Sequence, residues 1–225
     1  MAIFQAEDWA RGILWKWRCG WHQSRERRDV KRVQRELQNQ KDPVFTSDYH
    51  TRHAEIWQHV LASFRGKPDL RALEIGAYEG RSAIWLLENI WTHPSSEIVC
   101  VDRFCGNESS HEVRFDHNIR CKNLENRVRK LKGTSHEIVS QLENAPTFDL
   151  IYIDGSHYAN DVALDALLCW PRLKNGGLLI FDDYLWEPQF PATKRPQMAV
   201  DAFLELARGQ YEELHRDWQI IVRKI

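Results

Sequence analysis

Three carboxylates and one histidine follow two of the most apolar segments of the chain. Asp154 and His157 come after the first segment, and the adjacent residues Asp182 and Asp183 come after the second. If the two segments are neighbouring parallel strands, the carboxylates lie at one edge of a sheet and repel one another unless a cation lies between them. Oxygen ligands suit Mg²⁺ or another oxygen-preferring divalent cation better than zinc. The sequence therefore predicts a metal site.

His157 is the residue that we expect to move a proton at this site. A bound cation can hold an acceptor hydroxyl and lower its pKa, and a histidine three residues beyond Asp154 is placed to take the released proton. The ordinary pKa of histidine suits a general base near neutral pH. The alternative is that Asp154 and Asp182 cap helices and that His157 is a hydrogen-bonded surface residue.

A second group of residues predicts a cofactor loop. Gly76 and Gly80 follow a predicted strand, where glycine allows a tight turn and a close approach to a ligand. Their G-x-x-x-G spacing differs from the G-x-G-x-x-G that cradles a pyrophosphate, and the neighbouring Glu74 suits a cationic ammonium group better than a diphosphate. Asp102 ends the next predicted strand and can accept both hydroxyls of a ribose. A nucleoside with a cationic amino-acid tail is S-adenosylmethionine. Taken singly, the glycines and Asp102 also fit a plain turn and a helix cap.

These residues need elements that bring them to one edge, and the hydropathy pattern predicts such elements. Apolar strands without period-two alternation, separated by helical patterns, indicate a parallel sheet covered on both faces. We therefore predict an α/β fold with a doubly wound, mostly parallel sheet and an antiparallel terminal strand. The predicted strands are 73–75, 97–102, 128–132, 148–154, 178–181, 211–214 and 219–223. The predicted helices are 82–91, 111–124, 135–142, 159–170 and 199–207, with a turn at 171–177.

Residues 1–45 differ from the rest of the chain and are predicted to form a basic, tryptophan-rich helical arm before a domain at 46–225. Ten Lys and Arg but only three acids lie between Arg11 and Lys41. Ile13 and Trp17 share a helical face, and Pro43 ends the helical pattern. We expect the arm to pack on the domain or on a second copy of the chain. The alternative is a weak contact with a membrane surface or a partner protein.

Composition limits the remaining classes. The 225 residues suffice for one large domain with an arm. Lys and Arg number 31 against 32 Asp and Glu, so the balance gives no reason to expect nucleic-acid binding. Five widely spread cysteines, without a C-x-x-C pair, are typical of reduced thiols. With no signal peptide and no apolar run of about 20 residues, we expect a cytoplasmic protein.

Several of these segments resemble one known family. Residues 73–82 (Leu-Glu-Ile-Gly-Ala-Tyr-Glu-Gly-Arg-Ser) resemble the cofactor loop of catechol O-methyltransferase and its relatives. The segments 151–158, 173–177 and 181–184 are similar to the class I methyltransferases of macrocin, mycinamicin and novobiocin type, which act on sugar hydroxyls of natural products. The resemblance covers about residues 45–225. It implies a Rossmann-like fold and transfer of a methyl group from S-adenosylmethionine to a hydroxyl of a small molecule.

The resemblance also implies a role for each matching residue. Tyr78 and Ser82 would contact the cofactor near its carboxylate, and Ser135 would lie near the adenine. The implied cofactor-binding residues are Glu74, Gly76, Tyr78, Gly80, Ser82, Asp102, Ser135 and Asp154. The implied ligands of Mg²⁺ are Asp154, Asp182 and Asp183. His157 stands where the sugar-directed relatives have their general base.

Two other functions remain as alternatives. A nicotinamide-dependent oxidoreductase could use a similar sheet, although the G-x-G-x-x-G is missing. A noncatalytic binding module tethered by the arm is the second alternative, against which the intact set of Asp154, His157, Asp182 and Asp183 argues. The acceptor itself is not identified by the sequence. Phe104, Trp186 and Phe190 suggest an apolar or ring-bearing acceptor, or else the packing of a lid.

Overall fold

The computed structural model describes residues 26–104 and 109–225. The predicted helical face of Ile13 and Trp17 therefore lies outside the described residues. Among the described residues, no helix is both long enough and apolar enough to cross a lipid bilayer.

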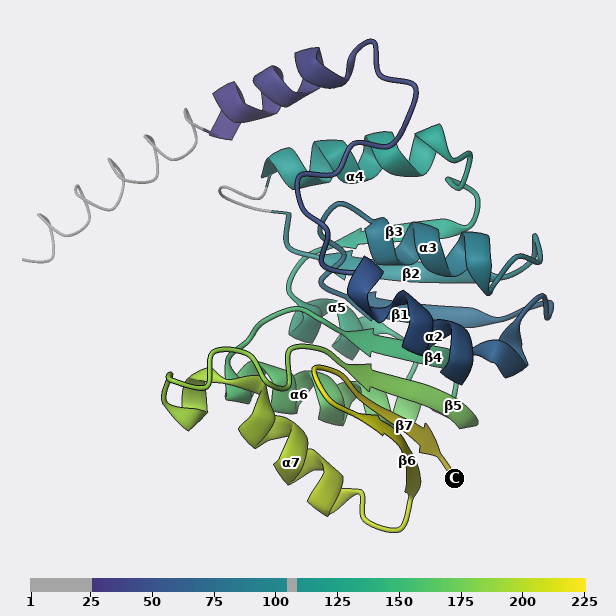
Figure 1. Cartoon of the computed structure of the whole chain (residues 1–225), viewed down its shortest axis with the longest axis vertical. Coiled ribbons are helices and arrows are strands. Elements are labelled where there is room, and N and C mark those ends of the chain that lie inside the picture. Colours follow the sequence, from purple (N-terminus) through teal and green to yellow (C-terminus); the bar gives the residue numbers. More distant parts are fainter. Residues whose placement is uncertain (1–25, 105–108) are drawn as a thin grey trace, which may run out of the picture.

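A seven-stranded sheet forms the centre of the molecule, with the strand order β3-β2-β1-β4-β5-β7-β6 (Figure 1). The first five strands of the chain are parallel to one another, β7 pairs antiparallel with β5, and β6 pairs antiparallel with β7 at the edge of the sheet. The predicted fold class is confirmed. The strands are β1 (Arg71–Ile75), β2 (Glu97–Asp102), β3 (Val128–Lys132), β4 (Phe148–Ile153), β5 (Leu173–Phe181), β6 (Tyr211–Arg216) and β7 (Ile220–Lys224).

Helices cover both faces of this sheet (Figure 1). Residues of α2, α3 and α4 share one core with the sheet, and residues of α5, α6 and α7 share the other. The helices are α2 (Ala54–Val60), α3 (Arg81–Asn89), α4 (Ser109–Cys121), α5 (Ser135–Gln141), α6 (Ala159–Cys169) and α7 (Pro196–Leu206). The 3-10 helix η1 (Thr51–His53) leads directly into α2.

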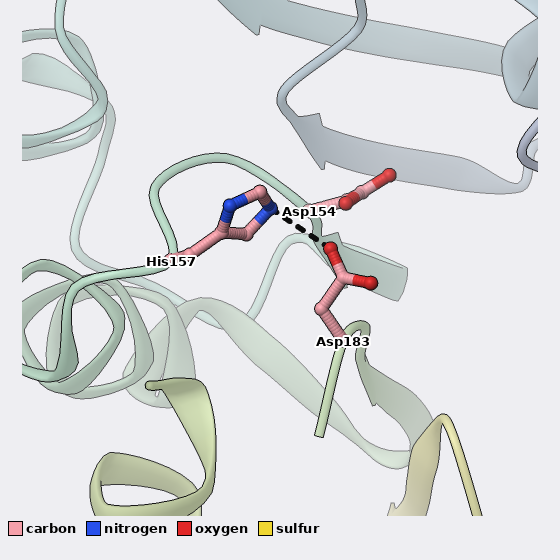
Figure 2. A group of neighbouring side chains, drawn as sticks. All are labelled: Asp154, His157 and Asp183. Carbon is pink, nitrogen blue, oxygen red and sulfur yellow. Dashed lines mark ion pairs between the residues drawn. The ribbon is translucent and has the colours of Figure 1, made fainter. Parts of the chain in front are cut away.

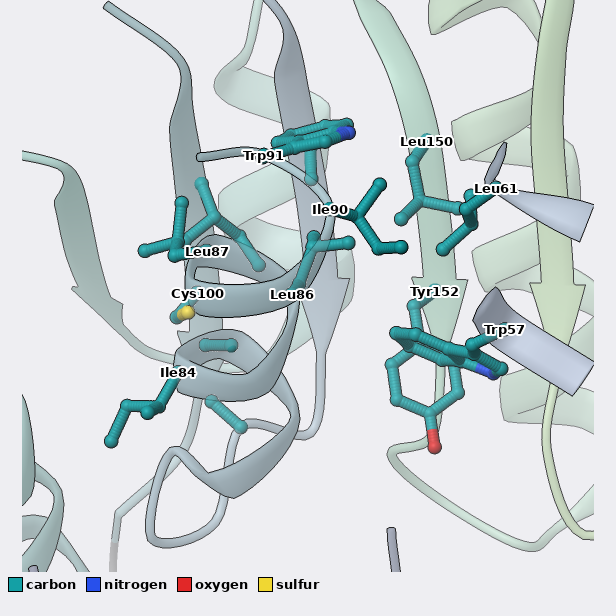
Figure 3. Packing of buried hydrophobic residues seen from close by; sticks show 14 of the residues in the cluster. Trp57, Leu61, Ile84, Leu86, Leu87, Ile90, Trp91, Cys100, Leu150 and Tyr152 are labelled. Atoms are coloured by element: carbon teal, nitrogen blue, oxygen red, sulfur yellow. The ribbon is translucent and has the colours of Figure 1, made fainter. Parts of the chain in front are cut away.

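Alternate residues of the central strands enter the two cores. Cys100 and Tyr152 belong to the first core, whereas Val101 and Ile151 belong to the second. In the first core, shown in Figure 3, the Trp57 ring of α2 packs edge-on against Tyr152, with the ring centroids 5.0 Å apart. Because both faces of these strands are buried, their sequences are apolar without alternation.

Two elements differ from the sequence prediction. The predicted turn at 171–177 is wrong, because β5 begins at Leu173, which is fully buried and pairs with Phe148 of β4. A shift in register between Phe148 and Leu150 accommodates the glycines that suggested a turn. The helix α2 was not predicted, although Trp57 and Val60 are buried at helical spacing.

The second half of the predicted arm forms a helix over residues 26–37 beside α4 (Figure 1). Its Val33 and Leu37 are buried, and its Glu36 accepts two hydrogen bonds from Arg114 of α4, at 3.0 and 3.3 Å. These contacts join residues 26–37 to the sheet domain. The domain boundary at residue 45 stays a prediction.

Residues 42–53, called the strap below, connect this helix to α2 and lie against the loop that follows β1. The Val44 backbone exchanges hydrogen bonds with the side-chain amide of Asn118, at 2.7 and 3.1 Å. The fully buried Glu79 accepts hydrogen bonds from the Thr46 amide at 2.6 Å and from the Thr46 hydroxyl at 2.8 Å. The Arg114 guanidinium lies 3.4 Å from the same carboxylate. The strap is therefore fixed to the predicted cofactor loop by buried polar contacts.

Candidate active site

The site lies where the strand order reverses, between β1 and β4. In open α/β sheets, the crevice at the carboxyl ends of such strands is where ligands bind. The Asp154 amide donates to the Ile75 carbonyl at 2.8 Å, and the Gly76 amide donates to the Val101 carbonyl at 2.9 Å. These bonds hold the residues that follow β1, β2 and β4 side by side.

Gly76 has no room for a side chain. Its φ is +89°, and a Cβ atom there would lie 1.9 Å from the Asp154 carbonyl oxygen. Both the backbone conformation and the close approach require glycine. Gly76, the first glycine of the predicted cofactor loop, therefore lies directly against the backbone of Asp154, a residue of the predicted metal site.

Glu74 and Ser82 lie beneath this loop and contact each other. The Ser82 hydroxyl donates to the Glu74 carboxylate, and the Cys100 thiol donates to it at 3.4 Å. Burial raises the pKa of Glu74 to about 7, against the opposing effect of these two hydrogen bonds. A largely buried acid with so high a pKa changes charge easily near neutral pH, so a cationic ligand nearby would favour its ionised form.

Asp102 ends β2 and links two loops. One carboxylate oxygen accepts from the Tyr78 amide and the other from the Phe104 amide, each at 2.9 Å. A carboxylate oxygen has a second lone pair, so each can still accept a hydroxyl. Phe104 itself is fully buried against Phe115, with ring centroids 5.5 Å apart. The suggestion that Phe104 faces an acceptor is therefore wrong.

Gly80 lies directly before α3, and Ser135 is the first residue of α5. Gly80 has a φ of +79° and precedes the first residue of α3. Ser135 begins α5 and is hydrogen-bonded to Asp165 of α6. Asp165 is buried, one of its oxygens has no hydrogen-bond partner among the described residues, and His136 lies 3.6 Å from that oxygen. Burial raises the pKa of Asp165 to about 6, although Ser135 and His136 oppose the shift.

Asp165→Asn is expected to stabilise the protein at alkaline pH. The pKa of the carboxyl group is about 3.8 without these surroundings and about 6 in the fold, so the folded state bears the cost of a buried charge above pH 6. Below about pH 4 the group is protonated in both states and the cost disappears. We expect a gain of about 1–3 kcal/mol at pH 8 that declines as the pH falls from 6 toward 4. Urea unfolding between pH 4.5 and 8 measures it.

The matched control for this change is Asp217→Asn, because Asp217 is exposed in the turn between β6 and β7. The Asp217→Asn variant also loses one negative charge, but that charge is exposed to solvent instead of buried. Equal or lower stability of the Asp165→Asn variant at pH 8 would show that the Asp165 carboxylate stabilises the contact between α5 and α6.

Asp154, His157 and Asp183 form a compact cluster at the ends of β4 and β5 (Figure 2). One ligand atom from each residue lies within 4.8 Å of the other two. His157 Nε2 is 2.8 Å from Asp183 Oδ2, and the His157 ring lies against the Trp186 ring with centroids 4.4 Å apart. Burial and the neighbouring Asp182 and Asp183 carboxylates raise the pKa of Asp154 well above its usual value.

Asp182 is held differently from its neighbour. Its carboxylate accepts hydrogen bonds from the Tyr152 hydroxyl, from Gln219 at 3.0 Å and from the Asp183 amide at 2.7 Å. The Trp57 indole N–H donates in turn to the side-chain oxygen of Gln219 at 2.8 Å. The Tyr152 hydroxyl is also 3.0 Å from the Asp154 carboxylate. Asp182 is thus part of a buried hydrogen-bond network below the cluster. Its role as a metal ligand stays a prediction.

Two residues of the strap, which sequence reasoning missed, reach these acids. Arg52 Nη2 lies 3.7 Å from Asp183 Oδ1, and His53 Nε2 lies 3.7 Å from Asp182 Oδ1. Burial lowers the pKa of His53, and its Nε2 accepts a hydrogen bond from Arg52 Nε at 2.8 Å. His53 therefore acts as a neutral acceptor rather than as the cationic partner of Asp182. No spacing in the sequence connects these residues with acids more than a hundred positions away.

The cluster fits a divalent cation in its donor chemistry. Two carboxylates and an imidazole are available within a small volume, and the pKa of Asp154 is raised by burial and by like charges that a cation would offset. Oxygen and imidazole donors are compatible with Mg²⁺, Mn²⁺ and related ions. The three ligands implied by the resemblance include Asp154 and Asp183 of this cluster.

Comparison with known proteins identifies the family. Residues 73–184 match the family model described as "Methyltransferase domain". A protein of Acanthamoeba polyphaga mimivirus, "Uncharacterized protein R132", is 30% identical over 167 residues, which are 69% of this chain and 71% of that protein. This chain belongs to this family of methyltransferases, and its sheet has the class I methyltransferase fold. The family resemblance in the sequence is thereby confirmed.

Solved structures share the fold at low sequence identity. The O-methyltransferase from Bacillus cereus in complex with S-adenosylhomocysteine (SAH) has a TM-score of 0.60 and 19% identity, covering 87% of this chain and 90% of that one. MycE methyltransferase from the mycinamycin biosynthetic pathway, in complex with Mg, SAH and mycinamycin VI, has a TM-score of 0.55 and 17% identity. The match covers 87% of this chain but 54% of MycE.

Proposed function

We propose that this protein transfers a methyl group from S-adenosylmethionine to a hydroxyl of a small molecule of sugar or natural-product type. The observation that carries the proposal is the cluster of Asp154, His157 and Asp183, which lies beside the glycine loop at the point where the strand order reverses. The complexes of the two solved structures with SAH, and of MycE with Mg and mycinamycin VI, support the same assignment.

The loop after β1 and the end of β2 are proposed to bind the cofactor. Gly76 keeps the backbone free of a side chain where the loop meets Asp154, and Asp102 offers both oxygens to the ribose hydroxyls. Glu74, Ser82 and Tyr78 would surround the methionine end, where an ionised Glu74 favours a cationic ammonium group. S-adenosylmethionine, when bound, supplies a methyl group that is activated by the sulfonium charge.

The acids at the ends of β4 and β5 are proposed to hold Mg²⁺ or a similar cation, with Asp154, Asp182 and Asp183 as ligands. Such a cation lowers the pKa of a hydroxyl that it binds. His157 would then take the hydroxyl proton on its unprotonated ring nitrogen, because Nε2, which faces Asp183 at 2.8 Å, already carries a proton. The Asp183 carboxylate stabilises the imidazolium that this step forms. Holding the acceptor oxygen in line with the methyl group contributes several kcal/mol more by removing orientational freedom.

The residues before the domain are proposed to act structurally. The buried contacts of Val33 and Leu37 and the pairing of Glu36 with Arg114 support an arm that packs on the domain.

A thermal-shift titration with SAH tests the cofactor assignment. A ligand that binds only the folded state at a hundredfold excess over its Kd adds about 2.7 kcal/mol of stability. For a chain of this size, that free energy corresponds to a rise in Tm of about 5–10 °C. We expect this rise with SAH, with and without Mg²⁺, and none with NADH. A rise with NADH and none with SAH would favour the oxidoreductase alternative and contradict the proposal.

A further inference from the structure

Trp186 and Arg52 contact the cluster directly, and Phe190 and Trp218 contact these two residues in turn. Trp186 lies against His157, and Phe190 approaches the Trp186 ring edge-on at 5.5 Å between centroids. Trp218 is 40% exposed and Phe190 is 43% exposed, which is unusual for residues of this size. A ring-bearing ligand with a hydroxyl at His157 would lie against these side chains.

Arg52 is held in place beside this surface by three contacts. Its Nε donates to the buried His53, its guanidinium lies 5.0 Å over the Trp218 ring, and its Nη2 is 3.7 Å from Asp183. A cation–π contact together with a hydrogen bond from Nε restrains a guanidinium while leaving its outer N–H groups free. Arg52 is thus oriented before any ligand arrives.

The contact with Asp183 does not use the hydrogen-bonding capacity of Arg52. At 3.7 Å it is longer than a hydrogen bond, whereas Arg114 binds both oxygens of Glu36 at 3.0 and 3.3 Å. Among the described residues, neither Nη1 nor Nη2 of Arg52 has a hydrogen-bond acceptor. Four N–H groups of this guanidinium are therefore available to a ligand.

We infer that the methyl acceptor carries a carboxylate, which Arg52 binds while the acceptor ring lies against Trp186. A guanidinium binds a carboxylate through two parallel hydrogen bonds, and one that is already restrained loses little freedom in doing so. The acids of the cluster repel an anionic acceptor at other orientations, so the carboxylate must point to Arg52 and the hydroxyl to His157. This inference rests on the proposed methyltransferase function and adds a substrate class to it.

Two acceptor types provide this chemistry, and matched pairs of compounds distinguish them. The first pair is 3,4-dihydroxybenzoate against catechol, in which the carboxylate is on an aromatic ring. The second pair is methyl glucuronoside against methyl glucoside, in which the carboxylate is on a sugar ring. Each pair keeps the ring and the neighbouring hydroxyls and changes the charged group.

The experiment compares the full-length protein with its Arg52→Gln and Arg65→Gln variants in the presence of Mg²⁺. Arg65 is an exposed arginine between η2 (Ala62–Phe64) and the start of β1, whereas the cluster lies at the carboxyl ends of the strands. It serves as the matched control. Calorimetric binding of each compound to the SAH complex gives Kd, and turnover with S-adenosylmethionine gives KM and kcat. We expect the carboxylate member of one pair to bind about 10–100-fold more tightly than its partner. Arg52→Gln should remove this preference through KM, and Arg65→Gln should retain it.

The outcomes separate the inference from the proposed function. Normal SAH binding without a preference for a carboxylate in either pair overturns the inference and leaves the methyltransferase assignment intact. A preference that survives in Arg52→Gln also overturns it. If Arg52→Gln lowered kcat equally for both members of a pair, Arg52 would serve Asp183 and not the acceptor. Absence of SAH binding in the unaltered protein would overturn both proposals.

Discussion

Replacing His157 with alanine is expected to lower kcat by about 100- to 10,000-fold, the range in which a positioned general base contributes. The imidazole is the proposed proton acceptor, and its Nε2 is oriented by Asp183 at 2.8 Å and by the stacked ring of Trp186. Alanine provides no group that can replace it at this position. SAH binding should persist, because His157 contacts neither Gly76 nor Asp102 in the structure. Steady-state turnover and a thermal shift with SAH measure the two effects separately.

The control is His59→Ala, since His59 is exposed on α2. A series of Mg²⁺ concentrations distinguishes the two roles that the cluster allows for His157. If His157 is the base, the loss of turnover is the same at every Mg²⁺ concentration. Recovery of the His157→Ala variant at high Mg²⁺ would instead make His157 a metal ligand. Full activity in the variant at pH 7 would remove His157 from the mechanism.

Gly76→Ala is expected to lower Tm by more than about 10 °C and to abolish SAH binding. The added Cβ would lie 1.9 Å from the Asp154 carbonyl oxygen and 2.8 Å from the Gly155 Cα, and both are backbone atoms. Relief requires the ends of β1 and β4 to separate, which breaks the bond between the Asp154 amide and the Ile75 carbonyl. A cost above about 3 kcal/mol corresponds to this shift, because each kcal/mol moves the Tm of a chain of this size by about 2–4 °C.

Gly176→Ala is the matched control for backbone strain. Gly176 has a similar φ of +81°, but no atom lies within 4 Å of the position of its Cβ. Its cost should be that of the strained conformation alone, about 1 kcal/mol, or about 2–4 °C in Tm. Equal losses for the two variants would show that the close approach at Gly76 is unimportant.

The sheet could be predicted because its signals are local. The strands β1, β2 and β4 are mostly apolar, and polar and glycine residues of the site lie at their carboxyl ends or directly after them. Parallel strands bring such residues to one edge whatever the details of packing. This is why Gly76, Asp102, Asp154, His157 and Asp183 could be grouped from sequence alone.

Orientation and long-range contacts could not be predicted. Neighbouring carboxylates look alike in a sequence, yet Asp182 points into the network of Tyr152 and Gln219 while Asp183 points to His157. Arg52 reaches the cluster because of the path of the strap, which no periodicity encodes. Phe104 turned inward for the same reason, since its burial depends on α4.

The strap gives the two ligand sites a common element. Thr46 fixes it to Glu79 in the loop proposed to bind the cofactor, and six residues later Arg52 reaches the cluster proposed to bind the acceptor. A ligand that binds to either site and restricts the motion of this segment lowers the entropy cost of binding at the other. Cofactor and acceptor should then each raise the affinity for the other by the same factor, as thermodynamic linkage requires. Each ligand would accordingly bind most tightly when the other is already bound, whichever of the two binds first.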